Sequence, residues 1–295
     1  MQQIDKTESD VRKNISLYSK RVRKSDVVLK MLIYFSALLT VGFFILLIAY
    51  IIVNGAGYIS LDFLLSSAES DGLLPIIINT LYVEFFTLIF AIPIGIGAAI
   101  YLTQYVKQGK FVKLIRFSTE TLAGIPSILF GLFGYAIFCV LFGLGSSIIA
   151  GCLTMIICVL PGIIRTTEEA LLTVPNSYKN GALALGAGKF RTIFEIVLPC
   201  AVPGILTSVI LAVGRIMGES AAFLLTIGTG TKMPKEVFSH IFSSGRTLTL
   251  HLYYMSGNGS VPDAMKICFA IATILLILIF VLNVLAKLLA KKFIH

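Results

Sequence analysis

The chain has 295 residues, of which 57% are hydrophobic and 13% charged, and its mean hydropathy is +0.94. Ordinary soluble domains carry about a quarter charged residues, so this composition excludes that class and indicates a protein embedded in a lipid bilayer. The net charge of +9 does not indicate nucleic-acid binding, because the Lys and Arg residues flank the hydrophobic segments and form no single patch.

Six segments are long and apolar enough to cross the bilayer, whose hydrocarbon core of about 30 Å takes a helix of about 20 residues. The first is too long for the apolar core of a signal peptide and lacks a small-residue cleavage site, so we interpret it as a retained anchor. The sequence predicts an all-α membrane protein with a polar tail at 1–30, a first helix at 31–53 and a transmembrane domain over 74–295. The six predicted spans are Met31–Val53, Leu74–Val106, Thr121–Leu144, Ser146–Ile164, Phe194–Ile227 and Ile267–Leu285.

The distribution of Lys and Arg predicts the orientation of these spans. Positive charges gather in the N-terminal tail, in the connection at 107–116 and at the C-terminus, whereas the connection at 54–73 holds only acidic charges. We expect both termini in the cytoplasm and an outer loop at 228–266. That outer loop also holds Lys and Arg residues, so the bias is incomplete.

Cysteine and histidine give no pattern of a metal or catalytic site. All five cysteines lie in apolar segments, where a free thiol behaves as a small hydrophobic group. The three histidines fall in the outer loop or at the C-terminus, without metal-ligand spacing. We therefore expect this chain to bind no metal and no cofactor of its own.

The cytoplasmic connection at 165–193 is unlike a simple loop. Its stretch NSYKNGALALG predicts a short helix that begins near Pro175 and Asn176 and ends at Gly186. The nearby GAGK is not a phosphate-binding loop, because Leu183 stands where that motif needs Gly and Phe190 where it needs Ser or Thr. Any ATP hydrolysis then belongs to another chain.

The same region resembles the EAA loop of ABC importer permeases, E-A-A-x3-G-x9-I-x-L-P. The leading Glu-Ala is replaced here by Asn180 and Gly181, and Glu168 and Glu169 upstream are candidates for the missing charged contact. The resemblance implies a type I ABC importer permease fold, in which this helix docks on the ATPase subunit. We also expect two prolines, at 199 and 203, to break the line between this helix and the fifth span. The matching positions are Asn180, Gly181, Ala182, Gly186, Ile196, Leu198 and Pro199.

Further stretches, LAGIPSILFGLFG, IRTTEEALLTVP and GRIMGESAAFLLTIGTG among them, resemble the phosphate-specific transport permeases, and SAAFLLT resembles their A-type subunit. This resemblance implies a plasma membrane of a bacterium or archaeon. The implied partners are a second, related permease, two ATPase subunits that carry ATP and Mg, and an extracytoplasmic phosphate-binding protein.

Arg215 and Glu219 are the strongest candidates for the substrate path. They lie four residues apart in the predicted fifth span, so on one helix they share a face. Arg215 is about 24 Å along that helix from Pro199, past the bilayer midplane. One interpretation is an ion pair that locks the bundle. The other is an anion site, because the planar guanidinium donates two parallel hydrogen bonds to an oxyanion.

Four further residues are weaker candidates for the path. Ser220 follows the pair directly, and Ser127 follows Gly124 and Pro126, which open a helix or only kink it. Glu84 lies in the second span, either on the path or hydrogen-bonded between helices, and Arg165 ends the fourth span as an interface anchor or a path residue. Gly95 and Gly97, together with Ala98 and Ala99, favour close helix packing.

The function that we expect is a permease subunit of an ATP-driven phosphate importer. One alternative is a permease for another oxyanion, such as molybdate or sulfate, or for another nutrient. A second is a membrane-embedded enzyme or sensor, which the lack of a nucleophile-base pair or metal cluster near Arg215 disfavours.

Overall fold

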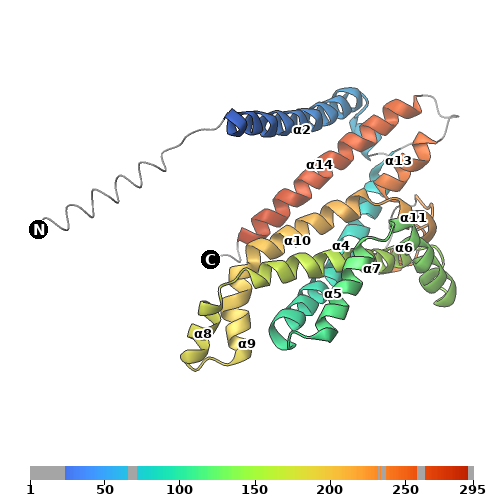
Figure 1. Cartoon of the computed structure of the whole chain (residues 1–295). Helices are drawn as coiled ribbons and strands as arrows, with labels where there is room; N and C mark the ends of the chain where they lie inside the picture. The colour runs from blue at the N-terminus through green and yellow to red at the C-terminus, as the bar shows by residue number, and fades with distance from the viewer. Residues whose placement is uncertain (1–23, 66–71, 232, 234–236, 258–262, 292–295) are drawn as a thin grey trace, which may run out of the picture. The chain divides into compact units, whose positions relative to one another are not determined.

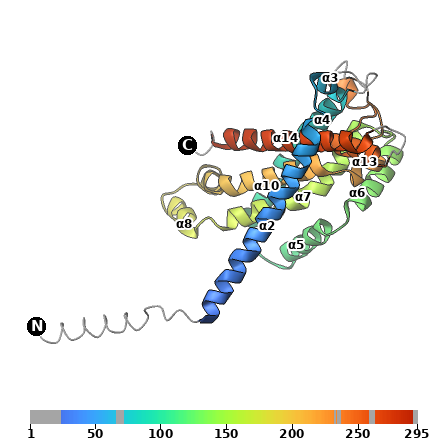
Figure 2. The same cartoon turned by 90° about the horizontal axis from the view of Figure 1, so that it is seen from above.

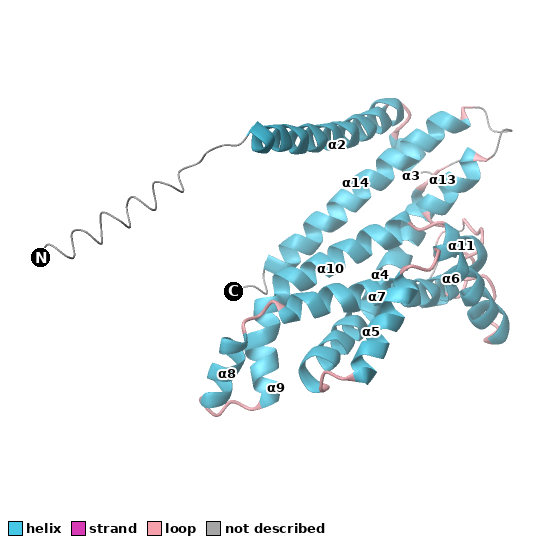
Figure 3. Ribbon diagram, viewed as in Figure 1, coloured by secondary structure: helices cyan, strands magenta, loops and turns pink. Residues whose placement is uncertain are grey.

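The computed structural model describes residues 24–65, 72–231, 233, 237–257 and 263–291. Every regular element in these ranges is a helix, as predicted (Figure 1, Figure 3). Five helices are long and apolar enough to span a membrane, and a bent pair makes a sixth if it counts as one span. The predicted tail at 1–30 lies mostly outside the described residues.

The chain divides into two compact units, one ending at Ile51 and the other beginning at Ile52. In the first unit the described residues belong to α2 (Lys24–Ala56), which contains the predicted span Met31–Val53. Beyond Lys30 this helix has no charged residue, and its apolar residues lie around the whole circumference. A helix with no polar face is suited to lipid or to other transmembrane helices.

The second unit is built around α4 (Leu74–Ile100) and α7 (Ile148–Leu172), which pack along their lengths (Figure 1). Small residues allow this approach: a Cβ on Gly95 would lie 2.5 Å from the Cγ2 atom of Ile163. Ala91 and Ala99 lie one turn to either side of Gly95 and are fully buried. The expected close packing is therefore confirmed at Gly95 and Ala99, but it is wrong at Gly97, which is exposed and has no atom within 4 Å of a built Cβ. In membrane helices, stripes of small residues replace the hydrophobic driving force that water provides elsewhere.

The predicted third span, Thr121–Leu144, is wrong as a single helix. The chain forms α5 (Lys110–Ala123), breaks at Gly124–Pro126, and continues as α6 (Ser127–Gly134) and a π-helical segment, Tyr135–Leu141. The two halves meet at 99°. Proline lacks an N–H donor and disfavours a helical conformation in the residue before it, so the helix ends here.

The predicted fifth span, Phe194–Ile227, is wrong at both ends. The helical segment runs over Lys189–Gly218, as α9 (Lys189–Thr192), a π-helical turn and α10 (Leu198–Gly218). After Gly218 the backbone becomes extended, and α11 (Ala221–Thr226) follows.

The proline pair at the start of α10 does not break the helix, contrary to our expectation. The π-helical turn Ile193–Val197 directly precedes Pro199, where an ordinary α-helix would bring the proline ring against the carbonyl of residue 195. The wider turn relieves this clash, and Lys189–Gly218 forms one continuous apolar helical segment of 30 residues.

The second unit also contains the π-helical turn Tyr101–Tyr105 after α4 and the short helix α8 (Asn176–Ala184). Three more short helices and one long one complete its described part. They are α3 (Leu61–Leu65), α12 (Val237–His240), α13 (Leu248–Ser256) and α14 (Ala264–Lys291). α14 packs on α10 and α13, and α6 and α13 lie at the end of the unit opposite α8 (Figure 2).

Candidate substrate path and coupling helix

One side of α10 is left open, and Arg215 lies at the edge of this side. Exposed positions recur on it every three or four residues from Cys200 to Leu211, and Gly218 follows two turns further on. Arg215 lies beside this stripe in the last turn and is partly exposed. The exposed members are Cys200, Pro203, Thr207, Leu211 and Gly218.

Arg215 has no acidic partner within ion-pair distance in the described parts of the chain. Its Nη2 atom donates to Cys158 Sγ on α7, at 3.4 Å. Thiol sulfur is a weak acceptor and a buried thiol is neutral, so this contact orients the guanidinium without neutralising it. A cation in a membrane-spanning helix without a counter-ion is costly and is typical of a functional site.

Glu219 does not share a helix with Arg215, so the predicted common helix face is wrong. α10 ends at Gly218, and Glu219 has φ −78° and ψ 130°, which is extended backbone. Its Oε1 atom accepts a hydrogen bond from the backbone N–H of Ala222 at 3.1 Å. Glu219 therefore caps the start of α11, and a negative charge is favourable at a helix N-terminus.

The other candidates near the path lie at helix breaks. Ser220 is part of the irregular link between α10 and α11, and its carbonyl accepts from the N–H of Leu224. Ser127 is the first residue of α6, next to the 99° bend. α6 and α11 pack closely, since a Cβ on Gly131 would lie 2.9 Å from the Cα of Ala222. The two helix breaks therefore belong to packed elements at one end of the unit.

Glu84 lies on the opposite side of α10 from Arg215. It lines an apolar groove of about 900 Å³ between α4, α10 and α14, together with Val209 and Val213. At 100° per residue, these valines point away from the open stripe at Thr207 and Leu211. The side chain of Glu84 is 3% exposed, and neither carboxylate oxygen has a hydrogen-bond partner.

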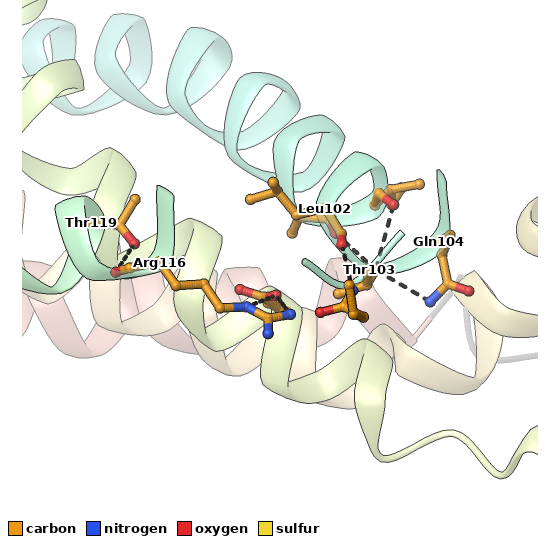
Figure 4. Close-up of polar contacts among 9 residues, drawn as sticks. Leu102, Thr103, Gln104, Arg116 and Thr119 are labelled. Atoms are coloured by element: carbon orange, nitrogen blue, oxygen red, sulfur yellow. Dashed lines mark hydrogen bonds and ion pairs between the residues drawn. The ribbon is translucent and has the colours of Figure 1, made fainter. Parts of the chain in front are cut away.

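Arg165 belongs to an ion-pair network between α5 and α7 and does not end a helix, since α7 continues to Leu172. Its guanidinium lies 3.1 Å from Glu169 and 3.3 Å from Glu120, and its side chain is 56% exposed. Close to this network, Arg116 on α5 pairs with the buried Glu168 on α7, with 2.7 Å between Nε and Oε1 (Figure 4). The exposed Glu169, a candidate for the charged contact of the EAA loop, is thus already ion-paired with Arg165.

The predicted short helix is confirmed as α8, which follows Pro175 and ends at Ala184, two residues before Gly186. Gly186 has φ +84°, its N–H bonds to the carbonyl of Leu183, and the N–H of Ala187 bonds to the carbonyl of Ala182. This pair of bonds is the Schellman motif, which needs a left-handed residue and so favours glycine.

α8 has one buried side and one exposed side. Ala182 is buried against the rest of the unit, whereas Asn180 and Gly181 are exposed. Leu185, the residue after the helix, is 90% exposed. The downstream motif positions lie on the long helix, with Ile196 and Leu198 partly buried and Pro199 exposed.

Sequence reasoning missed several polar contacts. Cys158 carried no signal beyond its apolar context, and the pairing of Arg116 with Glu168 joins residues 52 positions apart. His240 is also buried, with its Nε2 atom 2.7 Å from the Oδ1 atom of Asn79 on α4, and burial lowers its pKa. These contacts depend on tertiary packing, which no local pattern reports.

Comparison with known proteins identifies the family. Residues 91–295 match the family described as binding-protein-dependent transport system inner membrane component. The chain belongs to this family. It is therefore a multi-pass membrane protein and a transport subunit, not an enzyme.

Two relatives and one structure illustrate the likeness. The chain is 34% identical to the probable ABC transporter permease protein YqgI of Bacillus subtilis, over 82% of this chain and 86% of the relative. It is 33% identical to the phosphate transport system permease protein PstA of Mycobacterium leprae, over 64% of this chain and 61% of the relative. A chain of a bacterial alginate ABC transporter has the same fold, with a TM-score of 0.61, 17% identity and coverage of 92% of this chain and 96% of that one.

Proposed function

We propose that this permease carries inorganic phosphate into the cell, as one half of a translocation pathway powered by a separate ATPase. The observation that supports this most is the partly exposed Arg215, which lies beside the open stripe of α10 and is oriented by Cys158 without a carboxylate partner. A planar guanidinium suits a tetrahedral oxyanion through two parallel hydrogen bonds. Permeases of phosphate transport systems among its relatives support the choice of anion.

Arg215 alone does not neutralise a phosphate dianion. The second half of the pathway would come from a related permease that contributes further donors. Glu219 fixes the start of α11 in our proposal, so its role is to position the link next to Arg215 and Ser220 rather than to contact the anion.

Coupling to ATP hydrolysis would run through α8. Its exposed residues and the 90% exposed Leu185 offer a surface for an ATPase subunit, which would carry ATP and Mg. The two ATPase subunits, the second permease and an extracytoplasmic phosphate-binding protein would complete the importer. α8 would lie in the cytoplasm with both termini, and the membrane would be the plasma membrane of a bacterium or archaeon.

The test is uptake of radiolabelled phosphate by cells that express the complete transporter. We expect unlabelled phosphate and arsenate to compete, and sulfate and molybdate to compete weakly, because phosphate and arsenate keep an O–H donor at neutral pH whereas sulfate and molybdate are fully deprotonated and have none. Strong competition by sulfate or molybdate would instead favour a permease for another oxyanion. A matched strain without the binding protein controls for uptake by other routes.

A further inference from the structure

We propose that Arg246 and His251 form a second oxyanion site, which holds inorganic phosphate before the anion reaches Arg215. Both residues lie at the end of the unit opposite α8, Arg246 just before α13 and His251 within it (Figure 2). The proposal rests on the proposed function for the identity of the anion and for its direction of travel. The site itself depends only on the charge and the hydrogen-bond donors of this chain.

The guanidinium of Arg246 is held in place without being neutralised. Its Nη1 atom lies 3.2 Å from His251 Nδ1, and its Nη2 atom donates to the carbonyl of Thr229 at 3.0 Å. Its Cζ atom lies 5.0 Å from the centre of the Tyr254 ring, which is a cation–π contact. No carboxylate of the described residues lies within ion-pair distance of Arg246, and its Nε atom is buried without a partner. The cation therefore keeps N–H donors for an anion.

His251 adds a neutral donor beside this cation. Arginine only donates hydrogen bonds, so Nδ1 of His251 accepts from Arg246 and the neutral ring carries its proton on Nε2. Burial and the charge of Arg246 lower the pKa of His251 to about 4, so the ring is neutral at physiological pH. The Nε2–H group has no hydrogen-bond partner in the described parts of the chain, and the side chain is only half-buried. It is therefore free to donate to a bound oxyanion.

Hydrogen bonds fix the segment that carries Arg246. The Oγ atom of Ser244 accepts from the N–H groups of Thr229 and Gly230, both at 3.0 Å. The N–H of Gly245 donates to the carbonyl of Ile227, also at 3.0 Å. A set of donors that is already held in place loses little conformational entropy when a ligand binds, which favours binding.

Arg246 and Arg215 lie at the same end of α10. The hydroxyl of Thr249, near the start of α13, donates to the carbonyl of Met217 at 2.7 Å. Arg246 lies three residues before this contact on one side, and Arg215 lies two residues before it on the other. The open stripe of α10 also ends here, at Gly218. Two successive cations without carboxylate partners attract an anion, and the second reduces the cost of leaving the first.

The experiment measures the reactivity of a thiol at the site, in the complete transporter reconstituted in phosphatidylcholine vesicles. His251→Cys, in a Cys200→Ser background, is treated with a sulfonate-bearing or a trimethylammonium-bearing methanethiosulfonate. Ser256→Cys, at the exposed end of α13, is the control. We expect the ratio of the anionic to the cationic rate to be at least about fivefold higher at His251→Cys than at the control, because Arg246 attracts the sulfonate. Inorganic phosphate is expected to slow the anionic reagent at His251→Cys and not at the control.

Several outcomes overturn the proposal. They are no reaction of His251→Cys with either reagent, a rate ratio equal to that of the control, and a rate that neither phosphate nor sulfate changes. Arg246→Gln is expected to lower the ratio to that of the control, and an unchanged ratio also overturns the proposal. Vesicles with added phosphatidylglycerol separate free phosphate from a lipid headgroup. If this lipid protects the thiol and the free anions do not, the site holds lipid and the proposal fails.

Uptake of radiolabelled phosphate tests whether the site lies on the path. Arg246→Gln is expected to lower uptake at low phosphate by about fivefold or more, through the loss of charge-assisted hydrogen bonds. The matched control is Lys266→Gln, since Lys266 at the same end of the unit lies 3.1 Å from Asp263, and its uptake is expected to stay within about twofold of the unaltered transporter. Equal uptake in the two variants overturns the role of Arg246.

The thiol reaction also separates this proposal from the proposed function. Protection by sulfate in place of phosphate would contradict phosphate as the carried anion and leave the site intact. A lost rate ratio would contradict the site and leave the competition assay for phosphate unaffected. The reaction with Arg246 unaltered decides the matter even if Arg246→Gln does not fold.

Discussion

At the scale of single residues, the arginines differ in whether a carboxylate lies within ion-pair distance. Arg165, Arg116 and Arg191 each have a carboxylate within ion-pair distance, whereas Arg215 has only the thiol of Cys158. The paired arginines hold helices or a helical turn together. Arg215 is left with its charge available, which is the property that an anion path needs.

Replacing Arg215 tests whether the shape of its head group matters. Arg215→Lys keeps the charge but loses the two parallel donors, so we expect phosphate uptake to fall by about tenfold or more, since one lost charge-assisted hydrogen bond is worth roughly 1.5–3 kcal/mol. Arg215→Ala is expected to abolish uptake. The measurement is uptake normalised to the amount of assembled transporter in the membrane. Normal uptake with Lys would show that only a positive charge is needed.

At the scale of elements, the sequence predicted apolar helices better than it predicted their breaks. Hydropathy predicted that the second span ends at Val106, one residue beyond the end of the π-helical turn Tyr101–Tyr105 that follows α4. The predicted fifth span, however, continued through Gly218 and Glu219, where the helix ends. A single residue that leaves the helical conformation between two apolar segments changes the mean hydropathy very little. The break at Pro126 carried a signal, which we interpreted as either a kink or an opening.

The candidate site was affected by the same error. The spacing of Arg215 and Glu219 predicts a shared face only if the helix continues, and it ends between them. The Oε1 atom of Glu219 instead accepts a hydrogen bond from the N–H of Ala222, three residues later. This contact could be predicted only if α11 were known to begin at Ala221. By contrast, the role of Gly186 was predictable, because a glycine directly after the C-cap residue of a short helix is a recognised C-terminal pattern.

The end of α8 can be tested with a matched pair of glycines. Gly186 has φ +84°, and Gly186→Ala is expected to destabilise this turn by about 1 kcal/mol because a side chain disfavours that conformation. Gly188 has a negative φ of −67° and no atom within 4 Å of a built Cβ, so Gly188→Ala is the control. We expect Gly186→Ala to reduce phosphate-stimulated ATP hydrolysis by the transporter while Gly188→Ala does not. Equal hydrolysis in the two variants would contradict a role of α8 in coupling.

The contact between α5 and α7 gives a second test at this scale. Arg116→Ala leaves Glu168 buried and without its cation, and we expect a loss of roughly 2–4 kcal/mol in stability. Arg165→Ala removes two exposed pairs and is expected to cost less than about 1 kcal/mol. Thermal unfolding of the purified transporter in detergent measures both variants. The double variant Arg116→Ala with Glu168→Ala is expected to recover part of the loss, since no buried charge remains unpaired.

At the scale of the whole molecule, the two ends of the second unit are built from different elements. One end holds α8 and its exposed apolar residues, and the other holds the packed helices α6, α11 and α13 (Figure 1). An importer needs this polarity, because ATP drives it from the cytoplasm and the anion arrives from outside. The distribution of Lys and Arg predicts that α8 is inside, although the loop between α11 and α14 weakens the contrast.

Labelling of single cysteines decides this orientation. Of the native cysteines only Cys200 is exposed, so Cys200→Ser provides a background with little reactivity. Ser177→Cys places a thiol on the exposed surface of α8, and Ser256→Cys places one at the exposed end of α13. With a membrane-impermeant maleimide, we expect Ser256→Cys to react in intact cells and Ser177→Cys to react only in inside-out vesicles. The reverse pattern would place α8 outside, where no ATPase can reach it, and the proposed coupling would fail with it.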